Sequence, residues 1–349
     1  MRPSVRALLL AAPLLTGCVT AGCPAPRPQG DTDVTLVCDQ DYLPAVEALA
    51  AGAQQTLHIT QFELFTGSAT SVVVTALADA ADRGVEVRVL LDDEIEDNAG
   101  AVEALLDRGV DARLDDVPDT TLHAKMLVAD GSVALVGSTN WSNSSIARNQ
   151  ECNLRLDGGS PVAWLQAYVD AVWADPEPRV APTVDQSDAP RVQALGDDTL
   201  LPSLLELLDG AEDRVDFTLY ATFLQPDNPS SETMQVFQAL ADAADRGVTV
   251  RGVAEWSDWQ TDNNVRNTAA VQWLEERGVQ MRWEQPDVIT HAKTFLVDDT
   301  LQVQSANVSV SGFARNHETG ARTDLDEPVA AYVGWFGELW ELSTEEPVE

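Results

Sequence analysis

Two short histidine–lysine motifs hold the residues best suited to chemistry in this sequence. His123 is followed two residues later by Lys125, and His291 is followed in the same way by Lys293. These are the only two lysines of the chain, although it contains 21 basic residues. A chain that uses arginine for the rest of its positive charge has kept lysine at two matched places. This pattern indicates a chemical role for both motifs.

The residues that follow each motif are matched as well. Each copy continues with an Asp five residues after the Lys, then an apolar run, a Ser, an Asn and the pattern Ala-Arg-Asn-x-Glu. The first copy supplies Asp130, Ser138, Asn140 and Glu151, and the second supplies Asp298, Ser305, Asn307 and Glu318. The Asn and the Glu are equally far apart in both copies. Both stretches are therefore predicted to fold alike.

The spacing within each motif favours a β-strand. Side chains two residues apart on a strand project from the same face. A strand over His123–Ala129 would therefore point His123 and Lys125 in the same direction. Asp130 and Gly131 suit the tight turn of a hairpin that leads into a second strand, Val133–Gly137.

The rest of the chain repeats as well. Ala76–Val85 and Ala239–Val248 both read ALADAADRGV, and four predicted helices end in Arg-Gly-Val. Helical and β-rich segments alternate in each half, which predicts an α/β fold built from two repeated units of about 150 residues. We place the first unit at residues 34–175, a proline-bearing linker at 176–196 and the second unit at 197–345.

The first residues are predicted to direct export. Residues 1–17 combine two arginines with an apolar run too short to span a bilayer, which is typical of a signal peptide. The segment ends in Leu-Thr-Gly-Cys18, which resembles the lipobox of bacterial lipoproteins and implies a lipid on Cys18. Residues 18–33 would then tether the domain to a membrane, the outer membrane in a Gram-negative host. Ordinary secretion with nearby cleavage is the alternative.

Charge and cysteine content narrow the possible functions. The formal net charge is −36, which disfavours nucleic acid as a partner. If Cys18 carries lipid, Cys23, Cys38 and Cys152 are left in an oxidising compartment. One disulfide is expected, and we prefer Cys38 with Cys152. The cysteines and histidines show no zinc-binding spacing.

The motif His-x-Lys-x4-Asp followed by Gly-Ser-x-Asn resembles the signature of the phospholipase D superfamily, the HKD motif. The first copy matches it fully, while the second has one residue fewer before Ser305 and Gln304 where Gly is usual. The resemblance implies two mixed β-sheets flanked by helices and packed about a pseudo-twofold axis, with both motifs at one site. It also implies cleavage of a phosphodiester through a phosphohistidine, without a metal or cofactor.

The resemblance implies a role for each residue of the motif. His123 would attack phosphorus and His291 would serve as acid and base, although the near-symmetric motifs leave the reverse assignment open. The lysines and Asn140 and Asn307 would bind the phosphoryl oxygens, and Glu151 and Glu318 would orient the histidines. Ser138 and Ser305 are interpreted as supporting residues. Asp130 and Asp298 belong to the motif and count among the catalytic candidates, but their place near a turn indicates a backbone role.

The preferred hypothesis is a monomeric, lipid-anchored phosphodiesterase that hydrolyses phospholipids or transfers their phosphatidyl group. Three alternatives stay open. The same motif occurs in nucleases, which the strong negative charge disfavours, and in cardiolipin synthases, which transfer a phosphatidyl group to an acceptor alcohol. A non-catalytic lipid-binding or scaffold module could also keep the fold, but both His-x-Lys pairs are intact.

Overall fold

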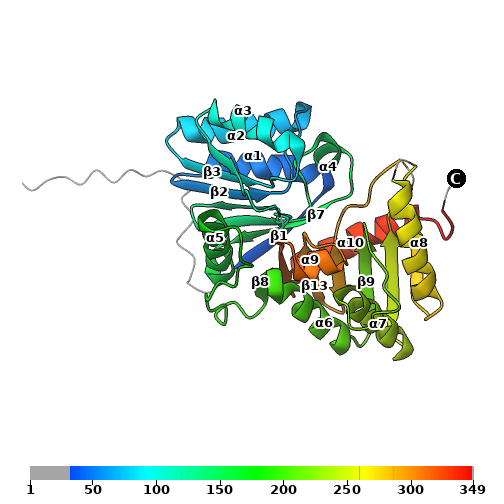
Figure 1. The fold of residues 1–349 in the computed structure, drawn as a ribbon. Coiled ribbons are helices and arrows are strands. Elements are labelled where there is room, and N and C mark those ends of the chain that lie inside the picture. Colours follow the sequence, from blue (N-terminus) through cyan, green and yellow to red (C-terminus); the bar gives the residue numbers. More distant parts are fainter. Residues whose placement is uncertain (1–31, 119, 259, 286, 348–349) are drawn as a thin grey trace, which may run out of the picture.

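The computed structural model describes residues 32–118, 120–258, 260–285 and 287–347, which form two α/β units (Figure 1). The first unit occupies the blue-to-green part of the chain and the second the green-to-red part. The predicted signal peptide, Cys18 and most of the tether lie outside the described residues. No helix within the described ranges has both the length and the apolar character needed to cross a bilayer.

The elements alternate as the sequence predicts. In the first unit they are β1 (Asp33–Cys38), α1 (Tyr42–Gly52), β2 (Thr56–Gln61), α2 (Ser68–Asp82), β3 (Glu86–Leu91), α3 (Glu96–Leu106), β4 (Asp111–Leu114), β5 (Met126–Ala129), β6 (Val133–Gly137), α4 (Asn143–Ala147), β7 (Cys152–Asp157) and α5 (Gly159–Ala174). In the second they are β8 (Val192–Gly196), α6 (Leu200–Gly210), β9 (Arg214–Leu219), α7 (Glu232–Asp245), β10 (Thr249–Ala254), α8 (Thr261–Glu275), β11 (Gln280–Trp283), β12 (Thr294–Val297), β13 (Thr300–Gln304), α9 (Val310–Ala314), β14 (Thr319–Thr323) and α10 (Asp326–Leu342).

Each unit contains one seven-stranded mixed sheet, and the two sheets share one topology. The orders are β1-β7-β6-β5-β2-β3-β4 and β8-β14-β13-β12-β9-β10-β11. In the first sheet β2, β3 and β4 run parallel, while β5, β6, β7 and β1 pair antiparallel. The predicted fold class, two repeated α/β units with mixed sheets flanked by helices, is therefore confirmed.

The two units share a buried core. One apolar cluster contains Leu122 and Val136 of the first unit together with Leu296 and Val303 of the second. The last helix of each unit also packs against the edge strand of the other, α5 on β8 and α10 on β1. Because this shared core is buried and closely packed, it fixes the position of one motif relative to the other.

Two boundaries differ from the sequence prediction. The predicted linker 176–196 is too long, because Val192–Gly196 forms β8 at the edge of the second sheet and pairs with β14. The second unit therefore begins at Val192. The predicted strand His123–Ala129 starts later, at Met126, because Leu122 and the backbone of His123 pair with His317 of the second unit instead of with a strand of the first sheet.

Two local predictions hold. The four glycines of the Arg-Gly-Val sequences all have positive φ, between 77° and 94°, as expected for left-handed helix caps. A disulfide joins Cys38 on β1 to Cys152 on β7, which fastens the edge strand to its sheet neighbour.

Candidate active site

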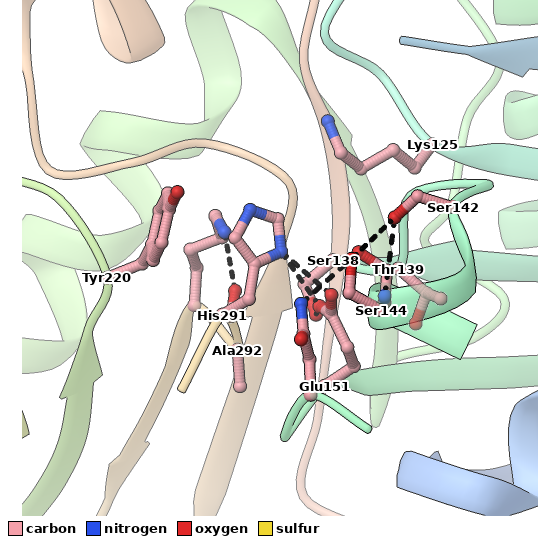
Figure 2. A network of polar contacts seen from close by, with 12 residues as sticks. Lys125, Ser138, Thr139, Ser142, Ser144, Glu151, Tyr220, His291 and Ala292 are labelled. Atoms are coloured by element: carbon pink, nitrogen blue, oxygen red, sulfur yellow. Dashed lines mark hydrogen bonds and ion pairs between the residues drawn. The ribbon is translucent and has the colours of Figure 1, made fainter. Parts of the chain in front are cut away.

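Each motif histidine is held by a glutamate from the other unit. His123 Nδ1 lies 2.9 Å from both carboxylate oxygens of Glu318. His291 Nδ1 lies 2.9 and 3.0 Å from the oxygens of Glu151. Figure 2 shows His291 with Glu151 on its Nδ1 side and Lys125 of the first unit across the same space. The crossed pairs bring both motifs to one site.

The backbone ahead of each histidine makes the same crossing. His123 N donates to the carbonyl of His317 at 3.0 Å, and His291 N donates to the carbonyl of Gln150 at 2.9 Å. Both carbonyls belong to the residue directly before an orienting glutamate. Each unit therefore fixes both the main chain and the ring of the partner histidine.

The glutamates are themselves held by the motif serines. Ser138 Oγ donates to Glu151 at 2.6 Å, and Ser305 Oγ donates to Glu318. Both hydroxyls also accept a backbone N–H from the following strand, at 3.1 and 3.0 Å. The serines lie behind the carboxylates rather than beside the imidazole Nε2 atoms. This placement agrees with the supporting role predicted for them.

The lysines of the motifs lie at the same site as the histidines, and the asparagines of the motifs are partly or fully buried. Lys125 Nζ donates to the carbonyl of His123 at 2.7 Å, Lys293 Nζ donates to the carbonyl of His291, and each lysine is 2% exposed. The Oδ1 atoms of Asn140 and Asn307 are buried and make no hydrogen bond within the described residues. The two buried ammonium groups are hydrogen-bond donors that could bind the oxygens of a phosphoryl group.

Burial and the neighbouring lysines set the charge of the histidines. Desolvation lowers the pKa of His123, opposed by the charge of Glu318. Desolvation also lowers the pKa of His291 well below its usual value, and Lys293 adds to the effect. Both rings are therefore neutral near pH 7. With the Nδ1 proton on the side of the carboxylate, the Nε2 lone pair is left free to act as a nucleophile.

The lysines and Glu151 titrate close to neutral pH. Desolvation lowers the pKa of Lys125 to about 8 and that of Lys293 to about 7. Desolvation also raises the pKa of Glu151 to about 7, against the attraction of Lys293. A bound phosphate anion would favour the charged form of both lysines, because opposite charges stabilise one another at short range.

Aromatic residues that the sequence did not reveal flank both histidines. The ring of Phe62 meets His123 edge-on with centroids 4.9 Å apart, and Tyr220 meets His291 in the same way at 4.3 Å. Each ring directly follows the matched strand, β2 or β9. Each also lies under the ammonium group of the neighbouring lysine, at 5.1 and 4.6 Å. Alignment of the two repeats could have found this pair.

Buried acids fix the backbone ahead of each histidine. Asp92 accepts a hydrogen bond of 2.7 Å from Leu122 N, and Glu255 accepts one of 2.9 Å from Thr290 N. Each donor belongs to the residue directly before a motif histidine. A carboxylate directly after a strand would ordinarily lie in solvent, but the side chain of Asp92 is fully buried. Asp92 and Glu255 both follow the matched strands β3 and β10.

A second acid accompanies each of these carboxylates. Asp115 lies beside Asp92, and desolvation together with that neighbouring charge raises the pKa of Asp115 to about 7. Glu284 lies beside Glu255, and desolvation together with that neighbouring carboxylate raises the pKa of Glu284 well above its usual value. In each pair, burial and the neighbouring carboxylate both favour the protonated form of one acid, since two adjacent buried negative charges repel one another.

The structure corrects the placement of Asp130 and Asp298 among the catalytic residues. Asp130 accepts hydrogen bonds from the backbone N–H groups of residues 54–56, at 2.7 to 3.2 Å, in the loop that leads into β2. Asp298 does the same for residues 212–214 at 2.8 to 3.0 Å. Both have positive φ, 52° and 49°, at a hairpin turn. They hold strand ends together and do not face the histidines.

The family model described as "Cardiolipin synthase, PLD-like domain" matches residues 46–173 and again 204–340. The chain belongs to this phospholipase D-like family. Its two matched segments coincide with the two α/β units. Within the described residues, no group of three or more His, Cys, Asp or Glu side chains is placed to hold a metal ion.

Curated relatives match shorter stretches. The mitochondrial cardiolipin hydrolase of Xenopus laevis is 32% identical over 128 residues, which is 36% of this chain and 59% of that protein. A phospholipase D of Rickettsia prowazekii is 34% identical over 86 residues, or 24% of this chain and 42% of the relative. The chain thus spans about half the length of the curated relatives it matches.

Solved structures share the fold over most of the chain. The phosphatidylserine synthase of Haemophilus influenzae superimposes with a TM-score of 0.71 at 12% identity, covering 90% of this chain and 87% of that one. A polyphosphate kinase of Porphyromonas gingivalis gives a TM-score of 0.62 at 14% identity, covering 88% and 47%. These similarities concern the fold alone.

Proposed function

We propose that the protein is a phospholipid phosphodiesterase that works through a phosphohistidine. The observation that carries the proposal is the crossed arrangement in which each unit's glutamate holds the other unit's histidine. Two imidazoles with free Nε2 atoms, flanked by two buried lysines, provide a nucleophile, a proton carrier and positive charge for one phosphodiester. The names of the relatives, cardiolipin hydrolase and phospholipase D, support a lipid substrate.

In the first step, Nε2 of one neutral histidine forms a bond to phosphorus and the bond from phosphorus to the leaving alcohol oxygen breaks. The second histidine, protonated once the phosphate anion is bound, gives its Nε2 proton to that oxygen. In the second step this histidine takes a proton from water, whose oxygen bonds to phosphorus as the P–N bond breaks. The products are the free alcohol and a phosphatidic acid, and both rings return to their starting state.

Lys125 and Lys293 would stabilise the negative charge that gathers on the non-bridging oxygens. Asn140 and Asn307 can donate to the same oxygens through their Nδ2 groups. We assign attack to His123 and proton transfer to His291, following the sequence prediction. Glu318 and Glu151 would keep each ring in the tautomer that presents Nε2 to phosphorus.

Phosphatidyl transfer is the second candidate, because the matched family model is described as that of cardiolipin synthases. It differs only in the second step, where an acceptor alcohol replaces water. The formal charge of −36 disfavours the nuclease alternative. We further propose that the chain is exported and lipid-anchored at Cys18, which the Cys38–Cys152 disulfide supports because disulfides persist in oxidising compartments.

A substrate panel tests the proposal. Labelled phospholipid vesicles, plasmid DNA, RNA and a small diester would be offered with and without an acceptor alcohol. We expect release of the lipid headgroup, lost in His123→Ala and in His291→Ala. Degradation of nucleic acid without lipid turnover would overturn the lipid assignment. Headgroup release that persists in either histidine variant would overturn the mechanism.

A further inference from the structure

Unpaired arginines are rare in this acidic protein. The sequence contains 57 acidic and 21 basic residues, and most described guanidinium groups bond to a carboxylate or a carbonyl oxygen. Within the described ranges, four arginine side chains make no hydrogen bond or ion pair. They are Arg108, Arg148, Arg266 and Arg315. Positive charge that is unpaired amid such an excess of carboxylates is available to another anion wherever the surrounding residues form a pocket.

Two of these arginines line one pocket of about 450 Å³ in the second unit. Arg315 directly follows α9, and Arg266 lies on α8 with its guanidinium 5.6 Å from the ring centre of Phe223. Phe223 is 51% exposed, which is unusual for a large apolar side chain of this protein. Polar side chains of the serines at 231, 309 and 311 complete much of the wall.

One carboxylate, Glu232, also lines the pocket and makes no ion pair there within the described residues. The two guanidinium groups therefore outnumber it. A guanidinium presents a planar set of N–H donors that matches a phosphate group. The pocket has the composition of an anion site with one apolar edge.

The pocket lies close to the candidate active site. Ser309 is two residues beyond Asn307, and Phe223 is three residues beyond Tyr220, whose ring contacts His291. Three residues span at most about 11 Å. The amide of Asn267, next to Arg266, also donates to the carbonyl of Tyr220 at 2.9 Å. The pocket is thus tied to the strand end that positions the histidine.

We propose that Arg266 and Arg315 form a subsite for a second phosphate of the substrate, beside the phosphodiester that is cleaved. This inference rests on the proposed function and narrows its substrate class to lipids whose headgroup carries a further phosphate. Phe223 borders the subsite and packs against the Arg266 guanidinium, which limits the positions that this side chain can take.

The test compares two short-chain lipids, both used below their micelle concentrations. One is phosphatidylglycerol and the other is the same lipid with a terminal phosphate on the glycerol. The full-length protein is compared with Arg266→Gln, Arg315→Gln and the double variant. Arg108→Gln is the matched control, because Arg108 is also unpaired and exposed but lines no part of this pocket.

Binding is measured by calorimetry with non-cleavable phosphonate analogues of both lipids, and turnover is measured with the lipids themselves. We expect the second phosphate to tighten binding, and each single variant to weaken that preference about tenfold, as loss of one charge-assisted hydrogen bond implies. KM for the bisphosphate lipid should rise with kcat unchanged. The single-phosphate lipid and Arg108→Gln should show no change.

Two results would overturn the subsite. One is a preference for the second phosphate that survives in the double variant, and the other is an equal loss in Arg108→Gln, which would reveal a general charge effect. If the wild type binds the bisphosphate analogue through both arginines but turns over neither lipid, the subsite stands and the proposed function fails. If the wild type turns over both lipids without any preference for the second phosphate, the proposed function stands and the subsite fails.

Discussion

The crossed His–Glu pairs make a specific prediction for Glu318→Gln. Glu318 is fully buried, and its two oxygens lie 2.9 Å from His123 Nδ1. Glutamine keeps the shape but removes the charge, and its amide can donate to Nδ1. The substitution therefore favours the tautomer with the proton on Nε2, where the lone pair is needed for attack.

The expected loss of kcat is bounded by two known magnitudes. A hydrogen bond to a charged group contributes about 1.5–3 kcal/mol, which corresponds to roughly a 10- to 150-fold change. In the Ser-His-Asp triad, an Asp→Asn change that imposes the wrong tautomer lowers kcat about 10⁴-fold. We therefore expect kcat of Glu318→Gln to fall roughly 10²- to 10⁴-fold. The exposed Glu103→Gln serves as the charge-matched control and should keep its kcat.

Nitrogen NMR of histidine-labelled protein separates this mechanism from simple misfolding. The chain contains only four histidines, so the spectrum can be assigned by single substitutions. Glu318→Gln should change the tautomer of His123, and Glu151→Gln should change that of His291. If each glutamate instead affected the histidine of its own unit, or if kcat stayed within twofold of wild type, the crossed arrangement would be wrong.

Three further predictions follow from the site and its supports. Asp130→Asn should lower the free energy of unfolding, measured by urea denaturation, by about 1–3 kcal/mol, because Asp130 accepts hydrogen bonds from backbone N–H groups. The kcat per folded molecule should stay unchanged. A large loss of kcat would show that Asp130 is a catalytic residue after all. The pKa of Lys293 is lowered to about 7 and that of Lys125 to about 8, so both side chains lose their charge as pH rises and kcat/KM should decline above about pH 7. The variant Lys293→Arg should lack the part of this decline that comes from Lys293. A kcat/KM that stays constant up to pH 9 would contradict the prediction. Removal of the Cys38–Cys152 disulfide by substitution of both cysteines with Ser should lower the free energy of unfolding by about 2–4 kcal/mol in the absence of reductant. In the presence of reductant, wild type and variant should be equally stable.

The sequence predicted the repeated α/β units and the residues that meet at the site because both depend on local patterns. Helix ends closed by Arg-Gly-Val and the His-x-Lys spacing are visible within a few residues. The edge strand β8 was missed because Val192–Gly196 pairs with β14, more than a hundred residues later, and sits beside prolines. A five-residue strand of this kind carries little periodic signal of its own.

The crossing of the two units could not be read from the sequence. Glu151 follows His123 in the chain, but it holds His291, and a symmetric repeat gives no sign of which histidine each glutamate serves. The buried pair Asp92 and Asp115 was also beyond reach, because a carboxyl group on a strand end reads as solvated until its neighbours are known. An alignment of the two repeats gives Asp92 and Glu255 equivalent positions, and this match could have revealed the role of both acids.

The stereochemistry at phosphorus tests the two-histidine mechanism most directly. A phosphorothioate lipid of one configuration would be hydrolysed in ¹⁸O-water, and the configuration of the product would be determined. Attack by a histidine followed by attack of water makes two in-line displacements, so we predict net retention. Net inversion would show that water attacks the substrate directly, and the proposed phosphohistidine would then be excluded.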